Sequence, residues 1–534
     1  MNMLTGRNFI GNSTSCKGET TFHAINPKED SSLEPVFYEA TKEEVNQAVE
    51  KAEEAFRIYR HKSGEEKAVF LETIANEIMN LGDPLIQRCS EETALSSGRL
   101  TGERARTVNQ LRLFAKVIRE GSWVDARIDT AEPKPDIKSM KMALGPVGVF
   151  GASNFPFAFS VAGGDTASAL ASGCTVVVKA HPAHPGTCEL IANAIQTAIE
   201  KTDMPDGTFS MIHGTSHQAG LTLVEHPLLK AVGFTGSFNG GKALFDAANK
   251  RPEPIPVYAE MGSTNPVFLL PGSLTENKEE LAEGFINSVK LGAGQFCTNP
   301  GLVSYLQGDD AEEFRNILID KFTKSNADTM LTSGICSAYE QGVKAMLKQE
   351  GVSLIAKANN DEDGKSTNEN ENGNGNGANN AIPHLFGIDA EHFLANPALE
   401  DEVFGPSSLA IAASNKDDLV KIADRLQGHL TATLYGTEED LQHHQELISI
   451  LQRKVGRLIF NGFPTGVEVN NAMIHGGPFP ATTDSRTTSV GTYAIDRFVR
   501  PVCFQNFPDS QLPDELKSNN PLDIWRLVNG DYRK

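Results

Sequence analysis

The sequence has no long apolar run and no cluster of basic residues. No stretch approaches the roughly 18 consecutive apolar residues that cross a bilayer, and residues 1–18 lack the apolar core of a secretory signal peptide. Asp and Glu number 69 against 48 Lys and Arg, which gives a formal net charge of −21. Such an acidic chain repels nucleic-acid phosphates and anionic membrane surfaces. We therefore expect no nucleic-acid partner and no membrane partner.

Cysteine is scarce and scattered. The 534 residues include no CxxC pair and only seven cysteines: Cys16, Cys89, Cys174, Cys188, Cys297, Cys336 and Cys503. An odd number of widely spaced cysteines argues against a disulfide framework and against a zinc site, so we expect no bound metal. This usage is typical of a protein in the reducing cytoplasm, where a single thiol can remain reactive.

Two common nucleotide-binding fingerprints are also missing. The sequence contains neither a GxGxxG segment after a strand nor a GxxxxGKS or GxxxxGKT loop. From residue 144, however, short apolar runs alternate with helical patterns, which predicts βαβ units and a parallel sheet. A second α/β block begins near residue 265. Since such sheets bind ligands beyond the carboxyl ends of their strands, the loops after Phe150, Lys179 and Phe234 should line one crevice.

Two further regions have a distinctive pattern. After a short polar start, apolar residues recur with the helical period and predict amphipathic helices at 43–56, 68–79 and 104–120. Residues 359–380 are rich in Asn and Gly and contain almost no apolar side chain. Little burial is then available to offset the cost of ordering them. We interpret 359–380 as a low-complexity surface insertion without a catalytic role.

Three residues in predicted loops or at strand ends are candidates for catalysis. Cys297 lies in Gly-Gln-Phe-Cys-Thr; a free cysteine is most often a small buried apolar residue, but a loop can also present a nucleophilic thiolate. Glu260 follows a predicted strand and is either a solvated carboxylate or a general base. Asn154 either caps the turn Asn-Phe-Pro or donates its amide to a developing oxyanion.

Other segments have the character of ligand-binding loops. Lys179 ends a predicted strand, where a lysine is usually only solvated. Gly236 and Ser237 open a helix, whose free N–H groups and dipole favour an anion. Glu402 and Phe404 lie in Glu-Val-Phe-Gly-Pro, which by itself is typical of an ordinary turn. None of these segments is decisive alone.

In their order and combination, the segments resemble the aldehyde dehydrogenase superfamily over residues 41–502. More specifically, residues 150–156, 162–170, 179–187 and 461–467 are similar to the subgroup of α-ketoglutaric semialdehyde (2,5-dioxovalerate) dehydrogenases and NADP-dependent fatty aldehyde dehydrogenase. The resemblance implies an α/β fold with two doubly wound parallel-sheet domains, a small β oligomerisation arm, and a homodimer or homotetramer. The implied boundaries are a dinucleotide-binding domain at 1–121 and 144–260, a catalytic domain at 261–483, the arm at 122–143 and 484–505, and a C-terminal tail at 506–534.

The resemblance also implies a reaction. Cys297 adds to an aldehyde, the Asn154 amide and the Cys297 N–H hold the oxyanion, hydride leaves to NADP or NAD, and Glu260 activates the water that hydrolyses the thioester. A non-catalytic relative would have lost at least one of these three side chains. An enzyme that passes the acyl group to Coenzyme A generally lacks the glutamate. Because all three residues are present, hydrolysis to a carboxylic acid is favoured.

The cofactor-binding residues are inferred in the same way. Lys179 and Glu402 would hold ribose hydroxyls, Ser237 with Gly236 the pyrophosphate, and Phe404 the nicotinamide side. NAD-preferring relatives carry a glutamate three residues after the lysine, and here that place is Pro182, next to His181. Losing a carboxylate relieves repulsion of a 2′-phosphate, so we expect NADP to be used, with NAD as a second cofactor.

Two substrate classes remain open within the subgroup: 2,5-dioxovalerate, oxidised to 2-oxoglutarate, and a medium- or long-chain fatty aldehyde. Arg106 and Arg486 are candidate partners for a substrate carboxylate, although either could equally form a structural ion pair. Phe155, Phe296 and Phe463 would suit a substrate of either class.

Overall fold

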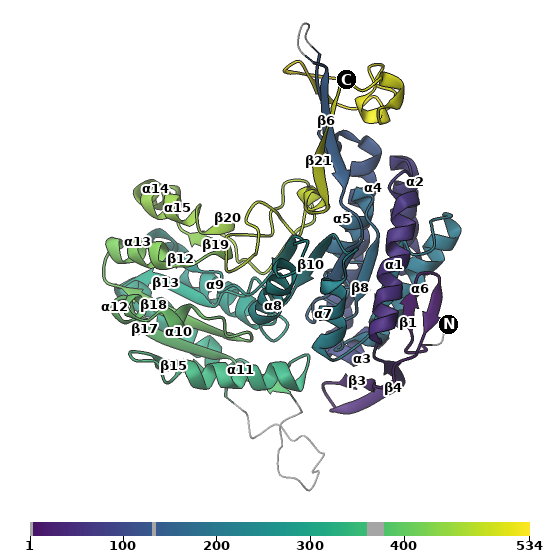
Figure 1. Ribbon diagram of the computed structural model, residues 1–534. Coiled ribbons are helices and arrows are strands. Elements are labelled where there is room, and N and C mark those ends of the chain that lie inside the picture. Colours follow the sequence, from purple (N-terminus) through teal and green to yellow (C-terminus); the bar gives the residue numbers. More distant parts are fainter. Residues whose placement is uncertain (1–3, 131–134, 360–378) are drawn as a thin grey trace.

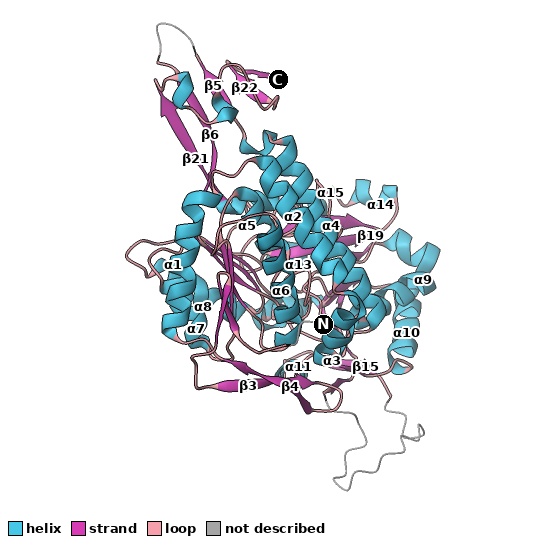
Figure 2. Ribbon diagram, turned by 90° about the vertical axis from the view of Figure 1, so that its right-hand side faces the viewer, coloured by secondary structure: helices cyan, strands magenta, loops and turns pink. Residues whose placement is uncertain are grey.

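Two large sheets and a smaller projecting sheet organise the chain (Figures 1 and 2). The computed structural model describes residues 4–130, 135–359 and 379–534. Each large sheet has seven strands, most of them parallel, with helices on both faces. This confirms the predicted α/β class with two doubly wound sheets. Among the described residues, no helix is long and apolar enough to cross a membrane.

The first sheet has the strand order β11-β10-β7-β8-β9-β1-β2. Its five strands from β11 to β9 are parallel, and β1 and β2 extend the sheet in antiparallel pairing. The strand order reverses at β7: β8 and β9 follow on one side of it, and β10 and β11 on the other. Open sheets bind ligands at such a point, which here lies beyond the carboxyl ends of β7 and β10. The strands are β1 (Asn8–Ile10), β2 (Ser13–Ser15), β7 (Val147–Phe150), β8 (Val176–Lys179), β9 (Phe209–Ile212), β10 (Ala231–Thr235) and β11 (Val257–Glu260).

Helices cover both faces of this sheet. Along β8, Val176 and Val178 pack against one group of helices and Val177 against the other, and all three are fully buried. Burial on both faces explains why the strand is a continuous apolar run rather than an alternating one. One face carries α2 (Gly64–Asn80), α3 (Gly82–Thr93), α4 (Ser97–Glu120), α5 (Gly164–Ser172) and α6 (Pro185–Lys201), and the other α1 (Lys42–Tyr59), α7 (His217–Glu225) and α8 (Phe238–Asn249).

The helices predicted at 43–56, 68–79 and 104–120 are α1, α2 and α4. Capping boxes start α1, between Thr41 and Glu44, and α2, between Ser63 and Glu66. The short polar start was predicted without strands, yet it contains β1, β2 and the hairpin of β3 (Thr21–Asn26) and β4 (Ser31–Tyr38). Phe9 of β1 pairs with Met211, about 200 positions later. No local pattern can reveal such a pairing.

The second sheet has the order β15-β17-β18-β13-β12-β19-β20, with only β15 antiparallel. The strands are β12 (Val267–Leu269), β13 (Leu302–Leu306), β15 (Ser353–Lys357), β17 (His384–Asp389), β18 (Ser407–Ala413), β19 (His429–Tyr435) and β20 (Val455–Phe460). One face packs against α9 (Pro271–Lys290) and α10 (Asp309–Thr323), and the other against α11 (Ser333–Met346), α12 (Ala390–Ala395), α13 (Lys416–Arg425) and α15 (Gln445–Leu451). Nearby lie α14 (Glu438–His443) and a small pair of β14 (Asp328–Thr329) and β16 (Asn380–Ala381).

The projecting sheet corrects two of the expected boundaries. Its order is β21-β6-β5-β22-β23, from β5 (Arg127–Asp129), β6 (Ile137–Ala143), β21 (Val499–Gln505), β22 (Arg526–Val528) and β23 (Asp531–Arg533). Residues 506–534 are therefore not a separate tail, because β22 pairs with β5. Without β22, the edge of β5 would be unpaired. Residues 484–498 hold no strand of this sheet; they end in a 3-10 helix, Thr492–Phe498, packed on the first domain. The insertion predicted at 359–380 lies almost entirely outside the described residues.

A buried ion pair fixes that 3-10 helix. The Arg497 guanidinium contacts the Asp165 carboxylate of α5, and the two side chains are 3% and 9% exposed. Asp165 also lies against Gly233 of β10, where an added Cβ would come within 2.7 Å of the carboxylate. The segment that precedes β21 is thus fixed to the middle of the first sheet.

We expect Arg497→Leu to lower the free energy of unfolding by about 3–5 kcal/mol, because it leaves the Asp165 carboxylate buried without a partner. Urea titration followed by intrinsic fluorescence measures this change. The matched control is Lys324→Gln, which breaks an exposed pair with Asp320 and should cost less than about 1 kcal/mol. Equal effects of the two substitutions would contradict this account of the Arg497 pair.

Candidate active site

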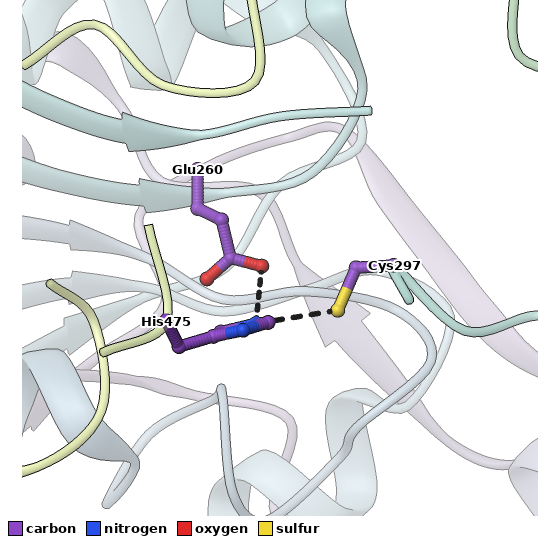
Figure 3. Close-up of side chains that lie close together, drawn as sticks. All are labelled: Glu260, Cys297 and His475. Atoms are coloured by element: carbon purple, nitrogen blue, oxygen red, sulfur yellow. Dashed lines mark hydrogen bonds and ion pairs between the residues drawn. The ribbon is translucent and has the colours of Figure 1, made fainter. Parts of the chain in front are cut away.

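Glu260, Cys297 and His475 meet at the carboxyl end of β11 (Figure 3). The His475 Nε2 atom lies 3.4 Å from the Cys297 Sγ atom, with which it makes a hydrogen bond, and 2.9 Å from Oε1 of Glu260. Glu260 ends β11, Cys297 lies in the loop after α9, and His475 lies in the long segment after β20. Three distant parts of the chain therefore build one cluster of a thiol, an imidazole and a carboxylate.

The loop that carries Cys297 is braced from both sides. The Asn265 side-chain amide donates to the carbonyl oxygens of Cys297 and Asn299, at 2.9 Å each. The Asn299 amide in turn donates to Gly294 at 2.9 Å and to Gly405 at 2.8 Å. Gly294 has φ +69°, and an added Cβ would meet the Gly405 carbonyl carbon at 2.2 Å, so only glycine fits there. This bracing holds the thiol in one place.

The site favours the protonated form of Cys297 and the ionised form of Glu260. Burial and the neighbouring Glu260 carboxylate raise the pKa of the Cys297 thiol well above its ordinary value, so the resting side chain is a thiol. Burial acts to raise the pKa of Glu260 too, but the contact with His475 and a 2.5 Å hydrogen bond from the Ser489 hydroxyl outweigh it and keep this pKa below its ordinary value. The cluster thus pairs a protonated nucleophile with an ionised carboxylate.

Sequence reasoning missed His475 and Ser489. The His475 side chain is 1% exposed. Its backbone N–H donates to the Thr488 hydroxyl at 2.7 Å, and its backbone carbonyl oxygen accepts from the Ser489 N–H at 2.8 Å. The only local signal is a single histidine ahead of two glycines in a segment without helical or strand periodicity. That signal is too common to identify a site.

The Asn154 side chain lies against the loop that carries Cys297. Asn154 follows β7, is 8% exposed, and its amide nitrogen donates to the Gln295 carbonyl at 2.9 Å, which leaves a second amide N–H beside the thiol-bearing loop. In the described part of the chain, the backbone N–H of Cys297 has no acceptor. Two donors thus remain for a developing negative charge next to the Cys297 sulfur.

A cavity of about 250 Å³ leads to Cys297. Its lining combines aromatic rings with charged side chains: Arg99, Glu103, Arg106, Phe155, Phe159, Phe296, Thr465, Val467 and Glu468. The structure thus brings the predicted substrate residues Arg106, Phe155 and Phe296 to one cavity beside the thiol. Small-molecule sites usually enclose about 300–1,000 Å³, so this cavity suits a short molecule.

The other two predicted substrate residues, Arg486 and Phe463, are not among the residues that line this cavity. Arg486 pairs with Asp484 through two hydrogen bonds of 2.9 and 2.7 Å, and its side chain is 85% exposed. The acidic residue two positions earlier captures the guanidinium at the surface. The Phe463 ring packs against Tyr435 at 4.8 Å and Phe285 at 6.0 Å, within the core of the second domain.

Three of the predicted cofactor residues, Lys179, Gly236 and Ser237, lie at the carboxyl ends of β8 and β10. Ser237 caps α8, its hydroxyl accepting from Gly240 N–H at 3.2 Å, so the start of that helix opens toward the carboxyl ends of the parallel strands. Gly236 lets this turn pass the Phe234 ring, since an added Cβ would lie 2.8 Å from it. Lys179 ends β8 and donates to the carbonyl oxygens of Ala180 and Gly214. Burial lowers the pKa of Lys179 to about 8, which still leaves it mostly cationic at neutral pH.

Glu402 and Phe404 lie next to the segment that follows β11. The Glu402 carboxylate lies against Gly262, where an added Cβ would be 2.3 Å from it, and accepts from Ser263 N–H at 3.4 Å. Both residues line a small cleft next to the segment that follows Glu260. They therefore lie close to the end of β11, where Glu260 is.

His181 and Pro182 follow β8 directly. The His181 ring stacks on His184 at 5.4 Å, and its Nδ1 accepts from Ala183 N–H at 3.2 Å. Burial, together with His184 and Lys179, lowers the pKa of His181 well below its ordinary value. His181 is thus uncharged at neutral pH and supplies no cation for a phosphate. Pro182 supplies no carboxylate.

The thiol, imidazole and carboxylate are also metal-ligand types, and their ligating atoms lie within 4.8 Å of one another. A zinc ion held by all three would take up the thiolate as a ligand. The nucleophile would then be blocked, so the arrangement serves covalent chemistry only while the sulfur is free.

Comparison with known proteins defines the class. The aldehyde dehydrogenase family model matches residues 14–498. A crystal structure of betaine aldehyde dehydrogenase from Staphylococcus aureus in complex with NAD+ is similar in fold, with a TM-score of 0.79, 20% identity, and coverage of 94% of this chain and 95% of that one. This chain belongs to the aldehyde dehydrogenase family.

Two relatives are similar to this chain over almost its whole length. Alpha-ketoglutaric semialdehyde dehydrogenase 2 of Azospirillum brasilense is 48% identical over 534 residues, with 99% of both chains covered. Alpha-ketoglutaric semialdehyde dehydrogenase of Acinetobacter baylyi is 46% identical over 537 residues, again with 99% of both covered. These relatives match the subgroup that the sequence motifs indicate.

We expect His475→Gln to move the acidic limb of the pH–rate profile for aldehyde oxidation to higher pH. His475 helps to keep the Glu260 pKa low, so its loss raises that pKa, and the ionised carboxylate is then present only at higher pH. Initial rates between about pH 5 and 9 measure the shift.

Two further variants test the cause of that shift. Ser489→Ala removes the other hydrogen bond that lowers the Glu260 pKa and should move the limb in the same direction. His392→Gln, at an exposed histidine paired with Asp389, should leave the profile unchanged. A profile that stays in place in the His475 variant would refute this role.

Proposed function

We propose that this chain oxidises α-ketoglutaric semialdehyde (2,5-dioxovalerate) to 2-oxoglutarate with NADP or NAD, by way of a thioester at Cys297. One observation carries the proposal: the thiol opens into a short cavity whose wall includes Arg106, and two guanidinium nitrogens of Arg106 are buried without a partner in the described residues. A carboxylate-bearing aldehyde satisfies these groups, whereas an alkyl chain does not. The names of the two relatives at 46–48% identity support the same substrate.

The first half of the reaction is addition of sulfur to the carbonyl carbon. As the bond forms, the ionised Glu260 carboxylate, which His475 Nε2 holds at 2.9 Å, accepts the thiol proton and then passes it to solvent. The carbonyl oxygen becomes the oxyanion of a thiohemiacetal. The Asn154 amide and the Cys297 N–H bind it; removing one such donor typically costs about 10²–10³ in rate.

The second half ends in a carboxylic acid. Bound NADP or NAD supplies the hydride acceptor, with Lys179, Gly236, Ser237, Glu402 and Phe404 as its binding residues. Glu260 then removes a proton from the water that attacks the thioester carbon, and the sulfur leaves. Overall, an aldehyde and water are converted to an acid, two electrons leave with the hydride, and one proton is released.

Use of NADP, with NAD as a second cofactor, is part of this proposal. Pro182 stands where NAD-preferring relatives carry a glutamate, so no carboxylate at that position repels a 2′-phosphate. Because His181 is uncharged, Lys179 is the cation of this loop that a phosphate can approach.

Assembly and compartment complete the proposal. The strand β21 forms one edge of the projecting sheet, with β6 as its neighbour on the other side, and edge strands of this kind readily pair with another chain. We therefore include a homodimer or homotetramer. All seven cysteines are free thiols, which supports a reducing cytoplasm.

We expect Cys297→Ser to abolish oxidation of 2,5-dioxovalerate, because a hydroxyl is a far weaker nucleophile than a thiolate. Glu260→Gln should form the thioester more slowly and then stall, since no carboxylate remains to accept the thiol proton or to activate water. Rapid-quench mass spectrometry detects an acyl adduct on Cys297 in the Glu260 variant, together with one burst of reduced cofactor. Cys503→Ser, at an exposed cysteine, is the control; full turnover by Cys297→Ser would end the proposal.

Cofactor preference gives a second test. We expect kcat/KM with NADP to be at least comparable to that with NAD. Pro182→Glu should reduce kcat/KM with NADP by about tenfold more than with NAD, because it restores a carboxylate near the 2′-phosphate. Ala183→Glu, one position along, is the matched control. Exclusive use of NAD by the unaltered enzyme would contradict the prediction.

A further inference from the structure

Two arginines of α4, not one, line the cavity that leads to Cys297. Arg99 and Arg106 are seven residues apart, so they lie on the same face of the helix, about 10 Å apart along its axis at 1.5 Å per residue. Long side chains can converge across that distance. Arg99 was not identified from the sequence, because it has no motif around it.

Arg99 packs against two aromatic rings that meet edge to face, with centres 5.1 Å apart. Its guanidinium carbon lies 5.0 Å from the Phe155 ring centre and 4.8 Å from that of Phe296. One terminal nitrogen, Nη2, donates to the Asn154 carbonyl oxygen at 2.7 Å. The other, Nη1, is buried and has no partner in the described residues. The two ring contacts and the hydrogen bond to Asn154 restrain the group and leave one terminal nitrogen as a free donor.

Arg106 is held in a similar way. Its guanidinium carbon lies 5.2 Å from the Phe159 ring centre, and Nε donates to the Val467 carbonyl oxygen at 3.2 Å. Both terminal nitrogens are buried and unpartnered within the part of the chain that the structure describes. Buried donors without acceptors carry a desolvation cost, and a bound anion would remove it.

Two glutamates share this wall with the two arginines. Glu103 lies between the arginines on α4, but one of its oxygens accepts from the N–H groups of Phe157 and Ala158, at 2.9 and 3.0 Å. Its own hydrogen bonds thus hold the backbone after Asn154. Glu468 is exposed, so water screens its charge. The match to a carboxylate therefore rests on the unpartnered N–H donors of the arginines and not on a net positive charge.

We infer that Arg99 and Arg106 form a two-arginine clamp, which binds the carboxylate of the substrate and makes the enzyme selective for short aldehyde acids over neutral aldehydes. This inference rests on the proposed function and extends it. The carboxylate binds between the free guanidinium edges, while the aldehyde carbon reaches Cys297 at the inner end of the 250 Å³ cavity. Arg99 also donates to the backbone of Asn154, so substrate binding and the oxyanion donor share one contact.

The test compares charged and neutral substrates in matched variants. Arg99→Gln and Arg106→Gln should each raise KM for 2,5-dioxovalerate and for glutaric semialdehyde by about tenfold or more, because each removes a charge-assisted hydrogen bond. KM for pentanal should change by less than about twofold. Arg112→Gln, at an exposed arginine on the same helix, should change neither.

A measurement without turnover separates binding from folding. The product 2-oxoglutarate should protect Cys297 from iodoacetamide in the unaltered enzyme, and about tenfold more of it should be needed in Arg99→Gln. Arg99→Lys keeps the charge but loses the planar stacked fork, so it should show an intermediate loss and replaces Arg99→Gln if that variant does not fold. Equal loss of pentanal and of acid oxidation would overturn the clamp, as would unchanged KM for the acids.

The outcomes also separate this inference from the proposed function. If the unaltered enzyme prefers 2,5-dioxovalerate and the arginine variants keep that preference, the clamp is wrong and the proposed function stands. If the enzyme prefers other short aldehyde acids and loses that preference in the variants, the clamp stands and the proposed substrate is wrong. If pentanal is preferred throughout, both are wrong.

Discussion

The contact of one imidazole with both a thiol and a carboxylate governs the chemistry of this protein. His475 Nε2 lies 3.4 Å from the sulfur and 2.9 Å from Glu260, in surroundings where burial alone would favour the neutral form of each acid. Removing water makes charges costly, so the site holds the sulfur protonated until a neighbouring base can take the proton. The braced loop of Cys297 and the buried ion pair of Arg497 keep these groups within reach of one another.

The side chains of the site come from several separate elements of the fold. The carboxyl ends of β7 and β11 supply Asn154 and Glu260 because parallel strands place their ends at one edge. The sulfur comes from a loop of the second domain, and His475 from a coil that crosses back to the first. Glu103 joins α4 to the turn that carries Asn154, since its carboxylate accepts from the backbone after Asn154. In the proposed reaction, substrate recognition and oxyanion binding therefore share one wall.

The sequence predicted much of the fold, and the failures have physical causes. Helices α1, α2 and α4 and the parallel strands carry their own periodicity and caps, so they could be found locally. The pairing of β1 with β9 and of β22 with β5 joins residues hundreds of positions apart, which no local pattern encodes. Arg486 failed because a carboxylate two residues away captures it, and Phe463 because an aromatic ring is as useful in a core as in a tunnel. His475 could not be found without knowing that residues 461–498 return to β11.

The segment that carries His475 and Ser489 runs through the 3-10 helix at Thr492–Phe498 directly into β21. The edge at which another strand can pair is thus continuous in chain with the segment that positions the imidazole, and the Arg497–Asp165 pair lies between the two.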